Sequence, residues 1–290
     1  RSGRGAVAMI KITPEMIKEL RERTGVAMNK CKEALEKAGG DMEGAIDFLR
    51  KSGMASAVKK ESRETNEGMI GIGESSSAIA IIEVNAETDF VTQNERFKQF
   101  LQDICQEAAE KKPASVEAFS NMSFSKDSSL TIDQYRSLIV QSLGENIKIK
   151  RLEILPKSSS ISYGLYSHMG GKIVTMVELG GGSGHEAFAR EIAMHIAAEA
   201  PDYLRPQDVP SNVKAREEEI ARSQIQGKPA QIADKIVEGK LKAFYDQCCL
   251  LCQKFIKDTA VSIQELLDKE SKKVGKMLSI HRFIRWKVGE

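Results

Sequence analysis

Two stretches of this 290-residue chain follow the same order of apolar and polar segments. In each, two apolar runs separated by a short polar turn lead into a loop and then into an amphipathic helix pattern. The apolar positions of the two helices match at one offset of 91 residues: Phe97 with Phe188, Leu101 with Ile192, and Cys105 with Ile196. This repetition predicts an α+β fold with two related hairpin-plus-helix subdomains, each with an antiparallel sheet.

Three helices are predicted before the first subdomain. "TPEMIKELRERTG" has Thr13 as an N-cap and Pro14 at the first helical position, and it ends at Gly25. "MNKCKEALEKAGG" and "DMEGAIDFLRKSG" follow with apolar residues at helical spacing, the former with Met28 on the same face as Cys31. So short a unit buries little surface, so we expect tight packing or docking to stabilise it.

The domain boundaries follow from these patterns. We expect a three-helix module over 9–53, a linker or exposed helical spacer over 54–67, and subdomains over 68–158 and 159–290. Residues 1–8 begin with Arg and lack the apolar core of a signal peptide, so they are expected to be an added tag that precedes a natural start at Met9.

Further elements are predicted inside the subdomains. In the first, residues 111–129 suggest an irregular polar connection, followed by the helix "TIDQYRSLIVQSLGE" and the strand "IKIKRLEIL". In the second, residues 211–251 are helical except near "QGKPAQ", which predicts an inserted antiparallel helical hairpin. A C-terminal module over 270–290 ends in "HRFIRWKVGE", whose alternation predicts a strand that joins the second sheet.

Composition limits the possible partners. The chain has 43 basic and 41 acidic residues, a balance that argues against a dedicated nucleic-acid binder. No apolar run approaches the roughly 18 residues that a membrane span requires. The five cysteines are odd in number and lack a framework spacing, which is typical of a reducing cytosol. "CCLLC" (248–252) could supply metal ligands, but no second pair completes a zinc site, so a structural role is favoured.

Other motifs give little support for catalysis. "LGGGSGHE" lies between a strand and a helix, as phosphate loops do. It lacks a final Gly-Lys-Ser/Thr, and His185 stands where a dinucleotide motif needs glycine, so a sharp turn is favoured. His195 fits a core position, whereas His168 lies at a strand end and could be displayed. No nucleophile elbow or catalytic triad order is present, so no enzyme is predicted.

The loop in "NAETDFVTQNERF" (85–97) places a large ring, Phe90, beside the carboxylate of Asp89. Asp89 could cap the loop while Phe90 packs in the core. Alternatively, the loop could display the ring to a partner. The preceding strand is already rich in apolar residues and the following segment is charged, which favours display. Burying one Phe in a partner's pocket is worth roughly 1.5–3 kcal/mol.

Several of these segments resemble the bacterial elongation factor Ts family, whose members are guanine-nucleotide exchange factors for elongation factor Tu. "ETDFV" followed by "N-E-x-F" is similar to that family's signature, and "ELRERTGVAMNKCKEAL" (19–35) resembles its ubiquitin-associated-like N-terminal module. "IAMHIAAEAP" and "FIRWKVGE" are also similar, so the resemblance extends from Met9 to Glu290. It implies a protein of the bacterial cytoplasm, or of an organelle of bacterial descent.

The resemblance also implies a mechanism and a set of contact residues. The turn over 88–91 would press on the partner GTPase near its magnesium ion, displace the ion, and so release GDP and allow GTP to load. The turn residues are Thr88, Asp89, Phe90 and Val91; the further partner contacts are Arg21, Val26, Met28, Lys32 and His168. In "YSHMGG" a Met follows the histidine, which predicts a longer turn than the family pattern.

On this interpretation the chain forms and breaks no bonds and needs no cofactor or metal of its own. Its partner is elongation factor Tu, GDP-bound or nucleotide-free, and neither nucleic acid nor a membrane is expected to bind. Two alternatives remain open. The three-helix module could belong to a ubiquitin-associated-type adaptor without exchange activity, or "GGGSG" could bind nucleotide in an enzyme.

Overall fold

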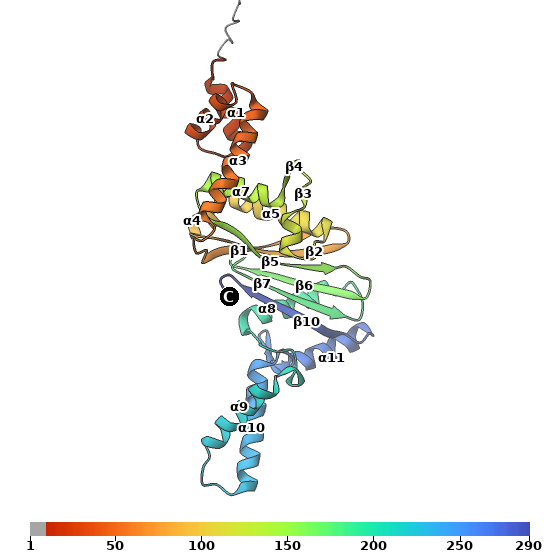
Figure 1. Cartoon of the computed structure of the whole chain (residues 1–290). Coiled ribbons are helices and arrows are strands. Elements are labelled where there is room, and N and C mark those ends of the chain that lie inside the picture. The colour runs from red at the N-terminus through yellow and green to blue at the C-terminus, as the bar shows by residue number, and fades with distance from the viewer. Residues whose placement is uncertain (1–9) are drawn as a thin grey trace, which may run out of the picture. The chain divides into compact units, whose positions relative to one another are not determined.

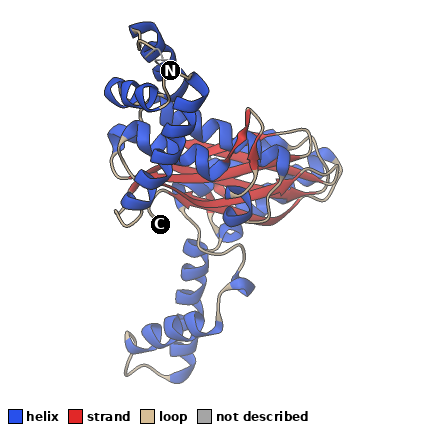
Figure 2. Cartoon of the chain, turned by 45° about the horizontal axis from the view of Figure 1, so that its top comes forward, coloured by secondary structure: helices blue, strands red, loops and turns tan. Residues whose placement is uncertain are grey.

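The computed structural model describes residues 10–290, so the expected tag and the start at Met9 lie outside the described residues. The chain divides into two compact units. One contains the chain up to Lys157 together with Val288–Glu290, and the other is Ser158–Lys287. Both combine helices with a three-stranded antiparallel sheet (Figure 2), which confirms the predicted α+β class.

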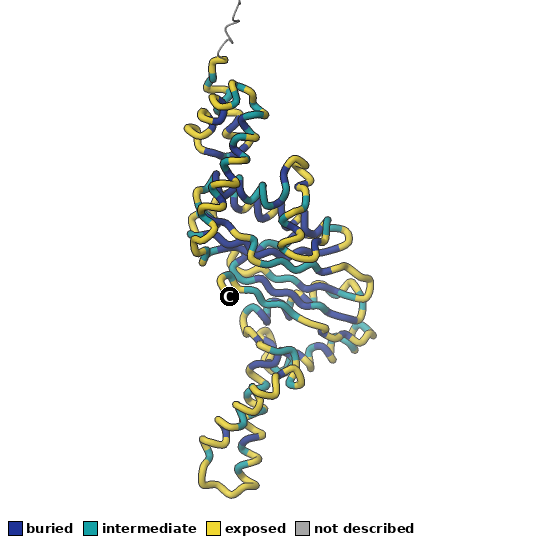
Figure 3. The backbone as a smooth tube through the Cα atoms, in the orientation of Figure 1, coloured by how far each residue is buried: buried dark blue, intermediate teal, exposed yellow. Residues whose placement is uncertain are grey.

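The first three helices form the predicted N-terminal module. They are α1 (Pro14–Thr24), α2 (Met28–Lys37) and α3 (Met42–Lys60). The hydroxyl of Thr13 caps α1 by accepting a hydrogen bond from the amide of Met16 at 3.2 Å, and Gly25 ends the helix with φ +70°. Each of the three helices has buried positions (Figure 3). A small hydrophobic cluster holds them together; its members include Leu20, Val26, Cys31, Ala34, Leu35, Ala45 and Leu49.

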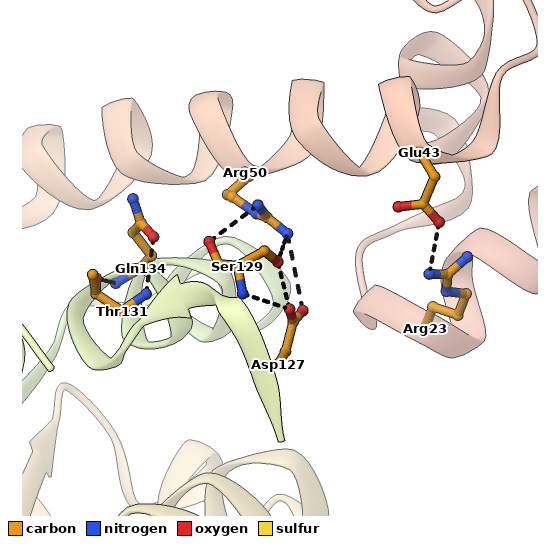
Figure 4. Close-up of polar contacts among 7 residues, drawn as sticks. All are labelled: Arg23, Glu43, Arg50, Asp127, Ser129, Thr131 and Gln134. Atoms are coloured by element: carbon orange, nitrogen blue, oxygen red, sulfur yellow. Dashed lines mark hydrogen bonds and ion pairs between the residues drawn. The ribbon is translucent and has the colours of Figure 1, made fainter. Parts of the chain in front are cut away.

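Helix α3 continues beyond the predicted module into the segment 54–67. Of the two alternatives for that segment, the helical spacer is found up to Lys60. There Ala57 is buried in the core of the first subdomain. Earlier in the helix, Arg50 Nη2 donates to Ser129 Oγ at 2.9 Å and lies 3.9 Å from the Asp127 carboxylate (Figure 4). One helix therefore packs against the module and the subdomain alike.

The first subdomain has the strand order β1-β2-β5, with α5 packed on β1 and β2 (Figure 1). Its main elements are β1 (Glu67–Glu74), β2 (Ala78–Ala86), α5 (Glu95–Lys111), α7 (Ile132–Leu143) and β5 (Ile147–Pro156). The predicted apolar face of α5 is buried from Phe97 to Ala108. At Gly73 a Cβ atom would overlap the carbonyl of Cys105, so the helix backbone lies directly on the strand.

The prediction of an irregular connection over 111–129 was wrong. That segment contains α6 (Val116–Ser120) and a small hairpin of β3 (Ser123–Phe124) and β4 (Asp127–Thr131). Its two phenylalanines, Phe119 and Phe124, are buried in the core. They lie too far apart in the sequence to show either a helical or a strand period, so the hydrophobic pattern of this segment predicts a loop.

Strand β2 is buried along its whole length, and this includes the charged Glu83, which has no exposed surface. Arg151 on the neighbouring β5 lies beside it, with Nε 2.8 Å and Nη2 2.7 Å from Glu83 Oε1. The amide of Asn85 donates to the other carboxylate oxygen at 3.0 Å. A carboxylate removed from water is tolerated only when it is paired and hydrogen-bonded in this way.

The second subdomain repeats this plan with the strand order β10-β7-β6. Its sheet contains β6 (Ile161–His168), β7 (Ile173–Gly180) and β10 (Ser279–Lys287), and α8 (Glu186–Glu199) packs on β6 and β7. The predicted C-terminal strand thus joins the second sheet, paired antiparallel with β7 from Ser279 to Lys287 with one register shift between Ile280 and Arg282.

The repeat extends further than the sequence indicated. The segment β3–β4–α7 has a counterpart 131 residues later in β8 (Lys254–Phe255), β9 (Asp258–Ser262) and α11 (Ile263–Val274). Thr131 and Ser262 both form capping boxes, with Gln134 and Glu265 respectively. Because the offset grows from 91 to 131 residues, an extra segment lies between α8 and β8.

That extra segment is the predicted helical hairpin. Helices α9 (Ser211–Ser223) and α10 (Ala230–Cys248) pack side by side (Figure 1), with the break at the predicted "QGKPAQ". Short 3₁₀ turns flank it, η1 (Pro206–Asp208) and η2 (Leu250–Cys252). The hairpin is therefore an insertion into the second copy of a repeated subdomain.

His195 on α8 is a buried core histidine, as predicted. The amide of Ile256 donates to its Nδ1 at 3.2 Å, so the ring proton lies on Nε2, which donates to Gln253 Oε1 at 2.9 Å. Both ring nitrogens therefore have partners in the neutral form. Burial lowers the pKa of His195, and the hydrogen bond to Gln253 opposes this only in part.

We predict that this histidine makes the second subdomain sensitive to acid. The unfolded chain binds a proton at pH of about 6.5, while the folded chain does so only at lower pH, so stability falls as pH drops through that interval. Urea unfolding followed by the single tryptophan, Trp286 on β10, should show this slope, and His195→Gln should flatten it. If the free energy of unfolding depended on pH equally strongly in the variant, His195 would not be the source of the acid sensitivity.

Candidate functional site

The segment after β2 is one helical turn, α4 (Asp89–Thr92), and its inner side is fixed to the first subdomain. Thr88 is the N-cap, and its hydroxyl accepts a hydrogen bond from the amide of Val91 at 3.4 Å. Val91 packs against the hydrophobic core, and Thr92 is fully buried with its hydroxyl donating to the Asp89 carbonyl at 2.9 Å. The turn is therefore an ordered part of the fold.

Phe90, on this turn, is 85% exposed, and Asp89 beside it is also exposed. This distinguishes the two alternatives for the loop: the ring does not lie in the core, and the cap is Thr88 rather than Asp89. An exposed ring gains nothing for folding, because its apolar surface stays in water. Such a side chain on an ordered connecting turn is typical of a binding surface.

In the N-terminal module, three of the predicted contact residues are exposed and one is buried. Arg21, Met28 and Lys32 are exposed, with Met28 at 56% and so not on the buried helix face that the sequence suggested. Val26 has no exposed surface and belongs to the core of the module. The expectation that the Val26 side chain contacts a partner is therefore corrected, because packing against its own module already occupies it.

The turn that joins α1 and α2 is bound to the first subdomain close to α4. Ser142 on α7 donates to the carbonyl of Gly25 at 2.7 Å. Arg96, in the first turn of α5, donates to the carbonyl of Arg21 at 3.4 Å. Since α5 begins three residues after α4 ends, the predicted contact residues of the N-terminal module and those of the 88–91 turn lie in the same region of this unit.

His168 lies in the other unit, at the end of β6, and it is exposed as expected. Its Nδ1 is 2.9 Å from the hydroxyl of Tyr166, and the Arg190 guanidinium lies 5.5 Å from the centre of the Tyr166 ring. Met169 follows with φ +52° in a four-residue turn over 169–172 before β7. The added Met thus lies in the turn itself, exposed like the histidine.

The glycine-rich segment after β7 forms a sharp turn. Gly181, Gly182 and Gly184 all have positive φ, between +94° and +125°, as the turn interpretation requires. The hydroxyl of Ser162 closes the turn: it donates to the Gly182 carbonyl at 2.7 Å and accepts from the amide of His185 at 3.0 Å. The amide at the start of α8 is thus already bonded within the protein.

The cysteines are all free thiols, and burial raises the pKa of Cys105. Cys248 Sγ and Cys249 Sγ are 3.8 Å apart at the base of the helical hairpin. Within residues 10–290, no group of three or more His, Cys, Asp or Glu side chains is arranged to hold a metal ion. In the same part of the chain, no helix is both long and apolar enough to span a bilayer.

Comparison with known proteins identifies the family of this chain. A sequence model described as "Elongation factor TS" matches residues 87–290. Elongation factor Ts of Protochlamydia amoebophila (strain UWE25) is 62% identical over 282 residues, covering 97% of this chain and 100% of the relative. Those of Chlamydia pneumoniae and Chlamydia muridarum (strain MoPn / Nigg) are 45% and 44% identical over 281 residues, with the same coverage. The chain therefore belongs to the elongation factor Ts family and is a translation elongation factor.

Proposed function

We propose that this chain is a guanine-nucleotide exchange factor that binds GDP-bound elongation factor Tu and promotes release of the GDP. The observation that carries this proposal is Phe90, 85% exposed on an ordered turn within "ETDFV". The turn inserts its ring among side chains of the partner near the bound magnesium ion. The ion then loses its coordination, GDP loses its main counter-charge, and GTP can load after GDP leaves.

The physical basis of this exchange is linkage between two binding equilibria. A protein that binds the nucleotide-free form of its partner more tightly lowers nucleotide affinity by the same factor. Each 1.4 kcal/mol of differential contact is worth about tenfold in affinity. No covalent bond forms or breaks, so the activity is not an enzyme reaction. Magnesium and nucleotide belong to the partner, and the chain needs no cofactor.

The four residues of the turn have two roles, contact with the partner and support of the turn. Asp89 and Phe90 are exposed and touch the partner, while Thr88 and Val91 hold the turn on the subdomain. Arg21, Met28 and Lys32 supply a second contact from the N-terminal module, and His168 supplies one from the other unit. We place this activity in the bacterial cytoplasm, without nucleic-acid or membrane partners.

The test is release of fluorescent GDP from purified elongation factor Tu of matched origin. Amounts of this chain well below the partner concentration should accelerate release, because one molecule serves many partners. Binding of the partner without faster release would contradict exchange and fit an adaptor with a ubiquitin-associated-like module. Direct binding of labelled GDP by the chain alone would instead support a nucleotide site of its own.

A further inference from the structure

The antiparallel pairing of β2 and β5 continues beyond the last backbone pair, Ala86 with Ile147. In the same register, the next residue pairs are Glu87 with Asn146 and Thr88 with Glu145. Here side-chain carboxylates replace carbonyl groups as acceptors. The amide of Asn146 donates to Glu87 Oε1 at 2.8 Å, and the amide of Thr88 donates to Glu145 Oε1 at 3.0 Å. The ladder is thus extended to the start of α4.

Glu145 makes a second bond to the same residue. The hydroxyl of Thr88 donates to Glu145 Oε2 at 2.7 Å. An ionised carboxylate can only accept hydrogen bonds, so it fixes where the hydroxyl proton points. The hydroxyl lone pairs are then free to accept from the amide of Val91, one residue beyond Phe90, at 3.4 Å. One carboxylate therefore controls both the backbone and the capping side chain of Thr88.

The support behind Glu145 is firmly held. Gly144, with φ +76°, ends α7 directly before it. Asn146 directly after it is buried, and its side-chain amide donates to the carbonyls of Arg63 at 2.9 Å and Glu61 at 3.3 Å. Glu145 is itself partly buried. Because the residues on both sides of Glu145 are fixed, its carboxylate can hold Thr88, and with it the turn, in one position.

From this geometry we infer that Glu145 is a positioning residue that sets the direction of the Phe90 ring, an inference that rests on the exchange function proposed above. A single helical turn is not stable alone, because its first hydrogen bond must offset the fixing of several backbone angles. Phe90 is too exposed for its own packing to orient it. The orientation of the turn therefore sets the direction of the Phe90 ring, and Glu145 holds the turn through Thr88.

The test variant is Glu145→Gln. It keeps the size of the side chain but replaces one carboxylate oxygen with an NH2 group, which cannot accept a hydrogen bond from the Thr88 amide or hydroxyl. We expect GDP release to slow about five- to tenfold, as for loss of one charge-assisted hydrogen bond. The same change in a Phe90→Ala background should have no further effect, because no ring is left to position. Glu117→Gln is the matched control: Glu117 is exposed on α6, outside the signature and the predicted contact residues.

A second measurement does not depend on the partner. In the free protein, hydrogen exchange at the amides of Thr88 and Val91 should quicken in Glu145→Gln but not in Glu117→Gln. Thr88→Val, which removes the hydroxyl alone, should quicken exchange at Val91 as well. If wild-type protein does not accelerate GDP release, the exchange function fails, and the amide exchange still decides whether Glu145 orders the turn.

Two results would overturn the inference. One is unchanged amide exchange at Thr88 and Val91 in Glu145→Gln. The other is an equal slowing of GDP release by Glu145→Gln with and without the Phe90 ring, because that pattern would indicate general damage rather than loss of positioning.

Discussion

Replacing Phe90 with alanine is expected to slow GDP release from elongation factor Tu by about 10- to 100-fold, as for loss of one buried aromatic side chain at a partner surface. The melting temperature of the free protein should stay the same, because the ring is 85% exposed and contributes no core packing. Release of fluorescent GDP and thermal unfolding of the same preparation measure both quantities.

Met277→Ala is a control of equal exposure, since Met277 is also 85% exposed and precedes β10 in the other unit. It should leave GDP release unchanged, which would separate the position of Phe90 from the general effect of removing surface hydrophobicity. A melting temperature lowered by several degrees in Phe90→Ala would instead assign the ring a folding role. Unchanged release in Phe90→Ala would remove the turn from the mechanism.

Local signals predicted those elements whose residues lie close together in the sequence. Thr13 and Gly25 mark the ends of α1 through hydrogen bonds to residues within four positions, and Pro14 fits the first turn because its ring presets the backbone angle. The buried face of α5 shows the helical period directly. The 91-residue repeat was visible because large apolar residues recur in the cores of both subdomains. The exposed Phe90 was predicted because polar residues surround it.

Features that depend on long-range pairing could not be predicted. The partner of Thr88 is 57 residues away, and only the register of β2 with β5 brings Glu145 to it. Val26 occupies a family-like motif, yet packing of three helices makes it a core residue. Glu83 lies within an apolar run, and nothing nearby in the sequence shows that Arg151 neutralises it across the sheet.

This Glu83–Arg151 pair leads to the largest expected effect on stability. Replacing Arg151 with methionine should lower the free energy of unfolding by about 3 kcal/mol, because a carboxylate without exposed surface then loses its main counter-charge. Lys150 is 3.8 Å from the other carboxylate oxygen and compensates only in part. Urea denaturation followed by circular dichroism measures the loss.

The double variant Glu83→Gln/Arg151→Met separates the cost of the unpaired charge from the loss of packing. It removes the charge that the single variant leaves behind, so it should be more stable than Arg151→Met by about 1–2 kcal/mol. Glu83→Gln alone should cost less than Arg151→Met, because the partly exposed arginine can be rehydrated. If the double variant were instead no more stable than Arg151→Met, packing of the arginine side chain across β2 and β5, and not neutralisation of the buried carboxylate, would be its main contribution to the sheet.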